Sequence, residues 1–295
     1  MNIIANRKIF FTISGALIGA SLLAVFVWGI PLGIDFKGGA LLEVEYTNER
    51  PAVGEIEDSL QVLDLGGVRV QETGDRGVII RTRTLVENEH GELLSILKES
   101  DQNLIEKRFT SIGPVLGEEL RSRATIALLL TSLVIILFIA YVFRHVSHPV
   151  KSWKYGVVAI IALLHDVLIP TGMMAVLGKF QGAEVDALFV TALLAILGLS
   201  VNDTIVVFDR VRENLTNKIS KDFAETVNTS LNQTIARSIN TSLTTLLVLG
   251  TLFFMGPEST QTFALILIVG LIAGTYSSIF LASPLLVTLE KRQKK

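Results

Sequence analysis

The 295-residue chain contains no cysteine, which excludes disulfide bridges, thiol catalysis and cysteine-based metal sites. Charge is scarce as well: only 18% of the residues are Asp, Glu, Lys or Arg, whereas average soluble domains have about 25%. The net charge of −2 and the lack of any basic groove argue against a nucleic-acid partner. Half of the residues are hydrophobic, and this composition is typical of a membrane protein.

Motifs of common enzymes are also missing. The sequence has no H-E-x-x-H, no G-x-S-x-G and no glycine-rich segment ending in GK[ST]. The adjacent His165 and Asp166 have no serine or cysteine nucleophile near them in sequence, so they are weak indicators of a hydrolase. We therefore expect a protein that is not an enzyme and that holds no cofactor and no metal ion.

Six hydrophobic segments are each close to the roughly 20 residues that a helix needs to cross a bilayer. The first follows Arg7 and Lys8; it is too long for the core of a cleaved signal peptide and lacks an A-x-A-like cleavage site, so we expect a retained signal anchor. The predicted fold class is an α-helical membrane protein, with membrane helices at about residues 9–30, 124–143, 155–177, 187–208, 234–255 and 263–289.

Basic residues predict the orientation of these helices. They flank the N-terminus, the segments after the second and fourth helices and the C-terminus, whereas the opposite short loops hold only Lys179. Both termini are therefore expected in the cytoplasm, and the large loop after the first helix is expected outside it. The basic or titratable residues after the second helix are Arg144, His145, His148, Lys151 and Lys154, and those at the C-terminus are Lys291, Arg292, Lys294 and Lys295.

The large loop, residues 31–123, reads as a small soluble domain between a first helix at 1–30 and a five-helix membrane domain at 124–295. Alternating hydrophobic residues and turn signals predict the order β-α-β-β-α-β of a ferredoxin-like α+β domain. Strands are predicted at 40–47, 68–72, 78–83 and 103–112, and helices at 51–65 and 88–100.

The segment 199–214, LSVNDTIVVFDRVREN, places Asn202 and Asp203 inside a hydrophobic run. An ionised aspartate at the centre of a membrane helix costs about 2.5–3.5 kcal/mol on insertion scales. Such an acid usually faces the interior of a helix bundle or a water-filled path, and it marks a functional site. A proton that crosses 100 mV supplies about 2.3 kcal/mol, so repeated protonation of Asp203 is a means of driving movement of the external domain.

Polar residues on the fifth predicted helix share one helical face, which must point at protein or water. If this helix begins near Gln233, Arg237 reaches the depth of Asp203, and we expect the two to form an ion pair. Gly270 and Gly274 begin a small-residue face on the sixth helix, so helices four to six should pack closely. The polar face comprises Ser230, Gln233, Thr234, Arg237, Asn240, Thr241, Thr244 and Thr245.

Structural alternatives exist for these polar groups. An Asp203–Arg237 pair that only fixes the helix register is one, and a serine- and threonine-rich face that only stabilises the bundle is another. His165 and Asp166 are either a buried hydrogen-bonded pair or part of the functional site.

Four segments together resemble the SecF branch of the SecD/SecF family of protein-export membrane proteins, and the resemblance spans the chain. They are 33–39 (GIDFKGG), 165–168 (HDVL), 199–214 and 237–245 (RSINTSLTT). The resemblance implies a proton pathway through Asp203 and Arg237, together with Asn202 and, as further members, His165, Asp166, Asp209, Asn240 and Thr244. It also implies a motif at the outer membrane edge, formed by Gly33, Asp35, Gly38 and Gly39, where we expect a structural turn that anchors the domain.

The family further implies partners and a location. Its members act with SecD and assist the SecYEG channel after the step driven by the SecA motor, with YajC nearby, and they use the proton-motive force to move a preprotein across the plasma (inner) membrane of a bacterium or archaeon. They resemble transporters of the resistance-nodulation-division superfamily, which place two adjacent acids on the fourth helix, whereas this chain has Asn202 and Asp203. The single acid suggests that a partner supplies further titratable groups.

Other functions stay open at this point. One is an exporter half of the same superfamily that moves lipid or small molecules, and another is an assembly scaffold that conducts no protons. Because the sequence begins at Met1 directly before the first helix, we expect a stand-alone subunit rather than a fusion with SecD.

Overall fold

A computed structural model describes residues 2–144 and 150–293. His145, His148, Lys294 and Lys295, which contribute to the predicted orientation, lie outside the described residues. The chain divides into two compact units. One consists of Met1–Ile30, Ala127–Ala183 and Leu188–Lys295, and the other consists of Pro31–Ile126 and Glu184–Ala187.

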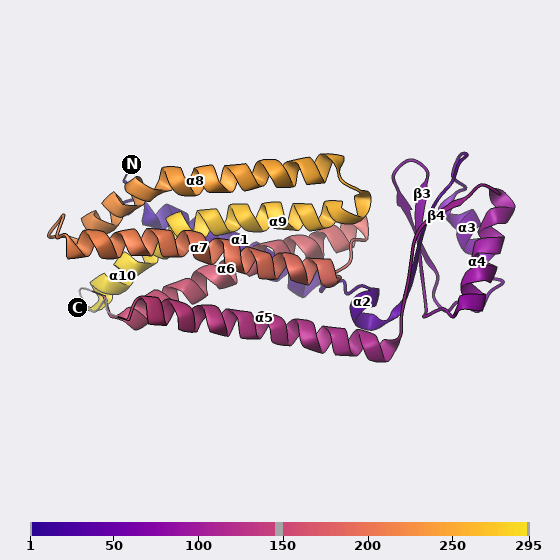
Figure 1. Ribbon diagram of the computed structural model, residues 1–295, viewed down its shortest axis with the longest axis horizontal. Coiled ribbons are helices and arrows are strands. Elements are labelled where there is room, and N and C mark those ends of the chain that lie inside the picture. Colours follow the sequence, from indigo (N-terminus) through magenta and orange to yellow (C-terminus); the bar gives the residue numbers. More distant parts are fainter. Residues whose placement is uncertain (1, 145–149, 294–295) are drawn as a thin grey trace. The chain divides into compact units, whose positions relative to one another are not determined.

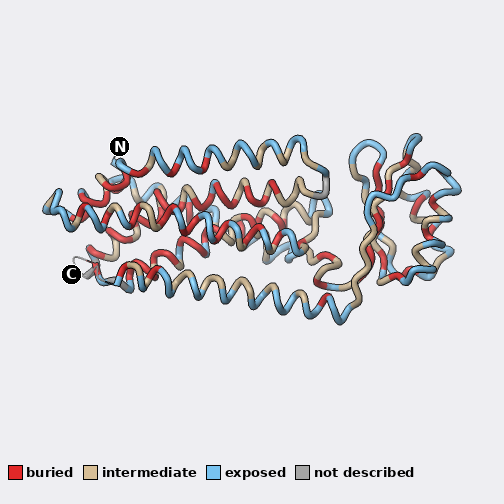
Figure 2. The backbone as a smooth tube through the Cα atoms, viewed as in Figure 1, coloured by how far each residue is buried: buried red, intermediate tan, exposed pale blue. Residues whose placement is uncertain are grey.

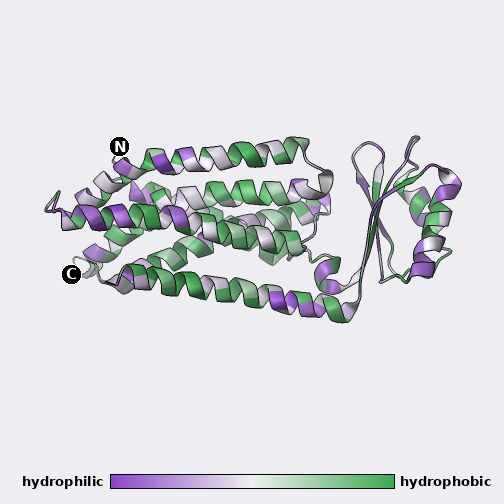
Figure 3. Cartoon of the chain, in the orientation of Figure 1, coloured by the Kyte–Doolittle hydropathy of each residue, from purple (hydrophilic) through white to green (hydrophobic). Residues whose placement is uncertain are grey.

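All six predicted membrane helices are confirmed, because the described residues include six helices that are long and apolar enough to cross a bilayer. Those of the first unit run alongside one another (Figure 1), and they consist mostly of hydrophobic residues (Figure 3). The helices are α1 (Arg7–Trp28), α5 (Pro114–Val142), α6 (Ser152–Gln181), α7 (Ala187–Thr216), α8 (Phe223–Met255) and α9 (Glu258–Tyr276), which continues through η1 (Ser277–Ala282) into α10 (Ser283–Gln293).

Close helix packing in the first unit depends on small residues. A Cβ atom at Gly270 of α9 would lie 2.1 Å from Cδ1 of Ile196 in α7, and one at Gly274 would lie 2.9 Å from Cβ of Ser200. The hydroxyls of Ser242 in α8 and Thr275 in α9 are 2.6 Å apart. The expected tight packing of the fourth, fifth and sixth membrane helices is therefore confirmed.

The last membrane helix is not regular, although its hydrophobic run predicts one continuous helix. Residues 277–282 form a π-helical turn, η1, in which one extra residue is accommodated between α9 and α10. Within it the Ser278 hydroxyl shares a 2.8 Å hydrogen bond with the Thr204 hydroxyl of α7, and the Ser277 hydroxyl also bonds outside its own helix. The irregular turn thus lies where the polar groups of three helices meet.

The second unit confirms the predicted β-α-β-β-α-β order. Its antiparallel sheet has the strand order β2-β3-β1-β4, which places β1 between β3 and β4. Leu42, Val44 and Ile80 are buried in a core of its own. The elements are α2 (Ile34–Lys37), β1 (Gly39–Glu45), α3 (Val53–Leu60), β2 (Arg69–Thr73), β3 (Gly77–Thr82), α4 (Glu87–Ser100) and β4 (Ile105–Ile112).

One boundary in this unit differs from the prediction. The helix predicted to run to residue 65, before Gly66 and Gly67, ends at Leu60. The reason is tertiary packing: Leu65 is buried in the core, and its carbonyl accepts a 3.1 Å hydrogen bond from the backbone N–H of Arg83. If the helix continued to residue 65, Leu65 could not both enter the core and accept this hydrogen bond from Arg83.

Candidate functional site

Asp203 lies on α7 and is only 7% exposed. Its carboxyl contacts the hydroxyls of Thr275 and Ser242, which come from α9 and α8. Three membrane helices therefore meet around one acid whose described partners are neutral hydroxyl groups. A buried carboxyl in such surroundings can exchange a proton when access to it changes.

The expected ion pair between Asp203 and Arg237 is not formed among the described residues, so that prediction is wrong. The helix register explains why. Asn214 near the end of α7 donates hydrogen bonds of 2.8 Å to Ser230 Oγ and Gln233 Oε1 of α8, which begins at Phe223 rather than near Gln233. Ser242, five residues and about 7.5 Å beyond Arg237, reaches the level of Asp203 instead.

The predicted polar face is divided between two sides of α8. Ser230 and Thr234 are buried and face the bundle, followed at intervals of four residues by Ser238 and Ser242, which the prediction did not include. Arg237, Asn240 and Thr244 are exposed, and the side of α8 that they share is called its outer side below. Figure 2 shows that most of α8 is exposed. Asn202 is exposed as well, and exposed Asp209 forms a 2.5 Å ion pair with Arg212 rather than joining Asp203.

Asp166 on α6 is the centre of a second, fully buried polar cluster. One of its carboxyl oxygens accepts hydrogen bonds from the hydroxyls of Ser200 and Ser277, the latter at 2.9 Å. The other oxygen lies 2.9 Å from Nδ1 of His165, whose ring stacks on Tyr276 at a centroid distance of 5.9 Å. Within the described part of the chain, Nε2 of His165 has no hydrogen-bond partner.

A series of buried hydrogen bonds leads from the Asp166 cluster to the residue next to Asp203 in sequence. Thr204, the neighbour of Asp203 in sequence, bonds Ser278, and the Ser278 hydroxyl donates to the carbonyl of Ser200 at 3.4 Å. Ser200 in turn bonds Asp166. The structure thus brings Asp203, Asp166 and His165 into one buried polar region, with Ser200, Ser242, Thr275 and Ser277 as members that the sequence reading missed.

The motif predicted at the outer membrane edge, Gly33, Asp35, Gly38 and Gly39, lies entirely in the second unit. Gly38 and Gly39 have φ values of +77° and +133°, which disfavour any residue with a Cβ atom. A Cβ at Gly38 would also lie 2.8 Å from Cα of Pro114, the first residue of α5. Asp35 accepts a 2.8 Å hydrogen bond from the backbone N–H of Ala187, and Gly33 donates one of 2.8 Å to the carbonyl of Val185.

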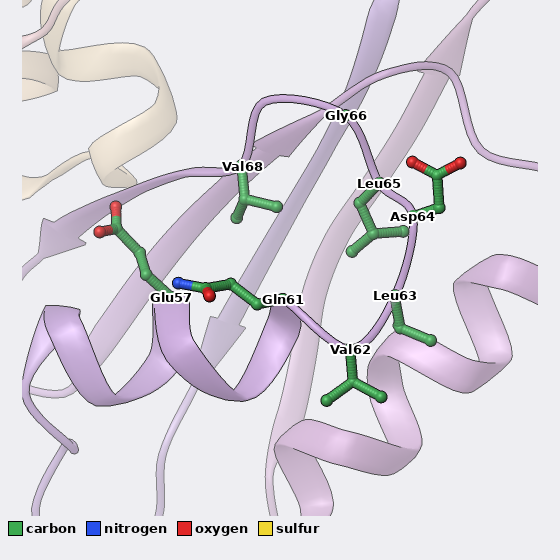
Figure 4. Close-up of a pocket in the computed structure, with 8 residues that line it drawn as sticks. All are labelled: Glu57, Gln61, Val62, Leu63, Asp64, Leu65, Gly66 and Val68. Atoms are coloured by element: carbon green, nitrogen blue, oxygen red, sulfur yellow. The ribbon is translucent and has the colours of Figure 1, made fainter.

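A hollow of about 490 Å³ lies at the end of α3 (Figure 4). Two acidic residues line it, Glu57 and Asp64. Oε1 of Glu57 accepts a 3.4 Å hydrogen bond from the backbone N–H of Val70. No group of three or more potential metal ligands occurs among residues 2–144 and 150–293. The hollow therefore offers no convergent chemistry comparable to that around Asp203.

Comparison with known proteins decides the family. Residues 92–292 match the model of the C-terminal region of the protein export membrane proteins SecD and SecF, and residues 24–49 match the SecD/SecF GG motif. The chain belongs to the SecD/SecF family. The glycines of the GG motif are Gly38 and Gly39, and the larger match includes both Asp166 and Asp203.

Within the SecD/SecF family the full-length similarity is to SecF subunits of the protein translocase. That of Thermobaculum terrenum is 43% identical over 99% of this chain and 95% of its own length, and that of Anaerolinea thermophila is 40% identical over 98% and 94%. These SecF relatives are named as translocase subunits and not as enzymes.

Two solved SecDF structures share this architecture. SecDF of Thermus thermophilus, described as a translocon-associated membrane protein, superposes with a TM-score of 0.86 at 32% identity, and SecDF in its super-membrane-facing form superposes with 0.71 at 33%. The matches cover 99% and 100% of this chain but only 39% of either SecDF chain. This chain therefore corresponds to less than half of a SecDF chain.

Proposed function

We propose that this chain is an accessory subunit of the Sec translocase that acts with SecD and uses the proton-motive force to promote preprotein translocation. The observation that carries the proposal is Asp203, buried on α7 between hydroxyl groups of α8 and α9. Each proton that moves through the site down a potential of 100 mV supplies about 2.3 kcal/mol. The buried hydrogen bonds from Thr204 through Ser278 and Ser200 to Asp166 supply further polar groups in the same helix bundle.

The outer side of α8 supports a partner subunit. Arg237, Asn240 and Thr244 are exposed on a membrane helix, and polar groups at membrane depth must face protein or water. A second membrane protein that covers this side of α8 would enclose Arg237 and supply the further titratable groups that a single acid lacks. SecD is the natural candidate, because the matching solved structures are SecDF chains of which this chain spans 39%.

The remaining partners and the location follow from the same function. A preprotein is the cargo, SecYEG is its channel, and SecA and YajC are neighbours in the plasma membrane of a bacterium or archaeon. Arg7, Lys8 and Arg144 flank membrane helices on the side that the positive-inside rule assigns to the cytoplasm. Both termini are then cytoplasmic, and the α+β unit lies outside, where the preprotein emerges.

The test uses vesicles that contain the channel, the motor, SecD and this chain under an imposed proton gradient. Asp203→Asn should abolish proton flux and late translocation while the variant still copurifies with SecD, and Arg237→Met should do the same. Glu213→Gln is the matched control, because Glu213 is an exposed acid on the same helix that pairs with Arg210 at 2.6 Å. Normal flux and export in Asp203→Asn would refute the proposal, as would a loss of SecD binding without any change of flux.

A further inference from the structure

The chain that enters the α+β unit is joined to the chain that begins α7. Leu32 and Val185 form a parallel β-bridge. The backbone N–H of Gly33 donates to the carbonyl of Val185 at 2.8 Å, and the N–H of Val185 donates to the carbonyl of Pro31 at 2.6 Å. We call residues 31–35 and 184–187 together the clamp.

A side chain reinforces the clamp at the first residue of α7. The first backbone N–H groups of a helix have no partner within the helix, and a carboxylate is favoured there by both hydrogen bonding and the helix dipole. Asp35 fills this role from 152 residues away, because its Oδ2 accepts the N–H of Ala187 at 2.8 Å. α7 is thus tied at its N-terminus by a residue of the α+β unit.

A third contact fixes the clamp to the sheet. Arg81 of β3 forms an ion pair with Glu184, in which Nε lies 3.0 Å from Oε2. The two side chains are only 14% and 20% exposed. Arg81 also donates to Oε1 of Gln71 in β2 at 2.9 Å, which holds its guanidinium in place. Residues 184–187 therefore belong to the compact unit of the sheet, although they precede a membrane helix in sequence.

We propose that the clamp is a permanent coupling joint, and that Asp35 is a positioning residue that transmits displacement of α7 to the α+β unit. Asp203 lies 16 residues beyond Ala187 on the same helix, about 24 Å along its axis. A helix is stiff along its axis, so a shift of α7 when Asp203 exchanges a proton moves Ala187. The clamp passes this movement to β3 through the contact between Glu184 and Arg81. This inference rests on the proposed function.

The first test changes Asp35 in the full chain, in the same vesicles, and measures translocated preprotein per proton conducted. Loss of a helix cap corresponds to about a fivefold shift in the capped population, or about 1 kcal/mol. Asp35→Ala should therefore conduct protons normally but lower that ratio about fivefold or more. Asp35→Asn, whose amide oxygen still accepts the Ala187 N–H, should keep a ratio close to that of the unchanged chain.

The absence of cysteine allows a second test by disulfide locking. In a Leu32→Cys, Val185→Cys variant, neighbouring strands bring the two Cα atoms to about 5 Å, within the range of a disulfide. The fraction that is cross-linked is read by gel mobility. Oxidation should leave translocation intact and should restore the ratio in the Asp35→Ala background.

Three outcomes would contradict the proposal that the clamp is a coupling joint. They are a normal ratio in Asp35→Ala, a loss of proton flux in Asp35→Ala, and a halt of translocation when the clamp is locked by oxidation. Failure of the proposed function is distinguishable from these, because it is read from Asp203→Asn: if that variant conducts protons, the function is wrong whatever Asp35 does. If it does not conduct and Asp35→Ala couples normally, only the joint is wrong.

Discussion

Gly172 is the position where the packing of the membrane helices makes the sharpest prediction. It lies on α6, against Ser21 of α1. A Cβ atom added at Gly172 would stand 2.4 Å from Cβ, 2.5 Å from Cα and 2.6 Å from Oγ of Ser21. Because Cα belongs to the backbone, a rotamer change cannot relieve the clash, and α1 and α6 must move apart.

The size of the effect follows from two opposing contributions. Carbon atoms pack best at about 3.5–4.0 Å, so Gly172→Ala requires a separation of about 1 Å at this point. Overpacking of this kind costs about 1–3 kcal/mol. Replacing glycine by alanine inside a helix contributes about 0.5–1 kcal/mol in the opposite direction.

Gly250→Ala is the matched control, because Gly250 lies inside α8 and an added Cβ there meets nothing within 4 Å. The two variants gain the same helix propensity, so the difference between their free energies of unfolding isolates the clash, about 1–3 kcal/mol. The assay is the thermal unfolding midpoint of each purified variant in one detergent. Gly172→Ala should lie below the unchanged chain, and Gly250→Ala should lie at or above it.

A reversion sharpens the assay. Ser21→Gly in the Gly172→Ala background removes the Cβ and Oγ contacts but leaves the one at 2.5 Å to Cα, so it should recover only part of the lost stability. Equal midpoints for Gly172→Ala and Gly250→Ala would refute the close approach of α1 and α6.

Two further predictions concern single side chains. Hydrogen bonding to the Arg83 guanidinium lowers the pKa of Glu89 from 4.5 to about 2, so the stabilisation from this pair is complete above about pH 4.5 and is lost as the pH falls through about 2. A carboxyl NMR titration of the full chain should show this midpoint, and Arg83→Met should return it toward 4.5; an unchanged midpoint would contradict the pairing. Asn214→Leu removes the bonds to Ser230 and Gln233 and should lower the free energy of unfolding by about 1–3 kcal/mol; an unchanged thermal midpoint would show that these bonds do not set the register of α7 and α8.

Hydrophobic length predicts the membrane helices well but their ends poorly. α8 begins at Phe223, about ten residues before the predicted start, although residues 223–233 are mostly polar. Phe223, Val227 and Leu231 are buried at intervals of four in the core of the first unit. Tertiary packing of these three buried side chains extends the helix. The mean hydropathy of the segment hides them, because the residues between them are mostly polar.

The acid was predictable, but its partner was not. An aspartate in a long apolar run is conspicuous in any sequence, which is why Asp203 was found. Choosing its neighbours on α8 requires the register between two helices, and the register depends on Asn214, which looks like an ordinary polar residue at a helix end. Helical spacing alone accommodates both Arg237 and Ser242, and it cannot say which of them lies level with Asp203.

Long-range contacts lie outside what local patterns describe. The turn at Gly38 and Gly39 follows from the glycines themselves, because their positive φ values exclude most other residues. The bond from Ala187 to Asp35 joins positions 152 residues apart, and no spacing rule connects them. The membership of residues 184–187 in the α+β unit became visible only in the structure.

The π-helical turn at Ser277–Ala282 determines which way all of α10 faces. Because η1 accommodates one residue more than a regular helical turn, a one-residue deletion that made it regular would leave α10 facing as before. A change that made η1 regular without a deletion would instead rotate α10 by about 100°, the advance of one residue in an α-helix. Leu286, Val287 and Glu290, now buried, would then turn toward the outside together. The segment can therefore lose one residue without moving the side chains that follow, whereas losing the irregular turn itself moves all of them.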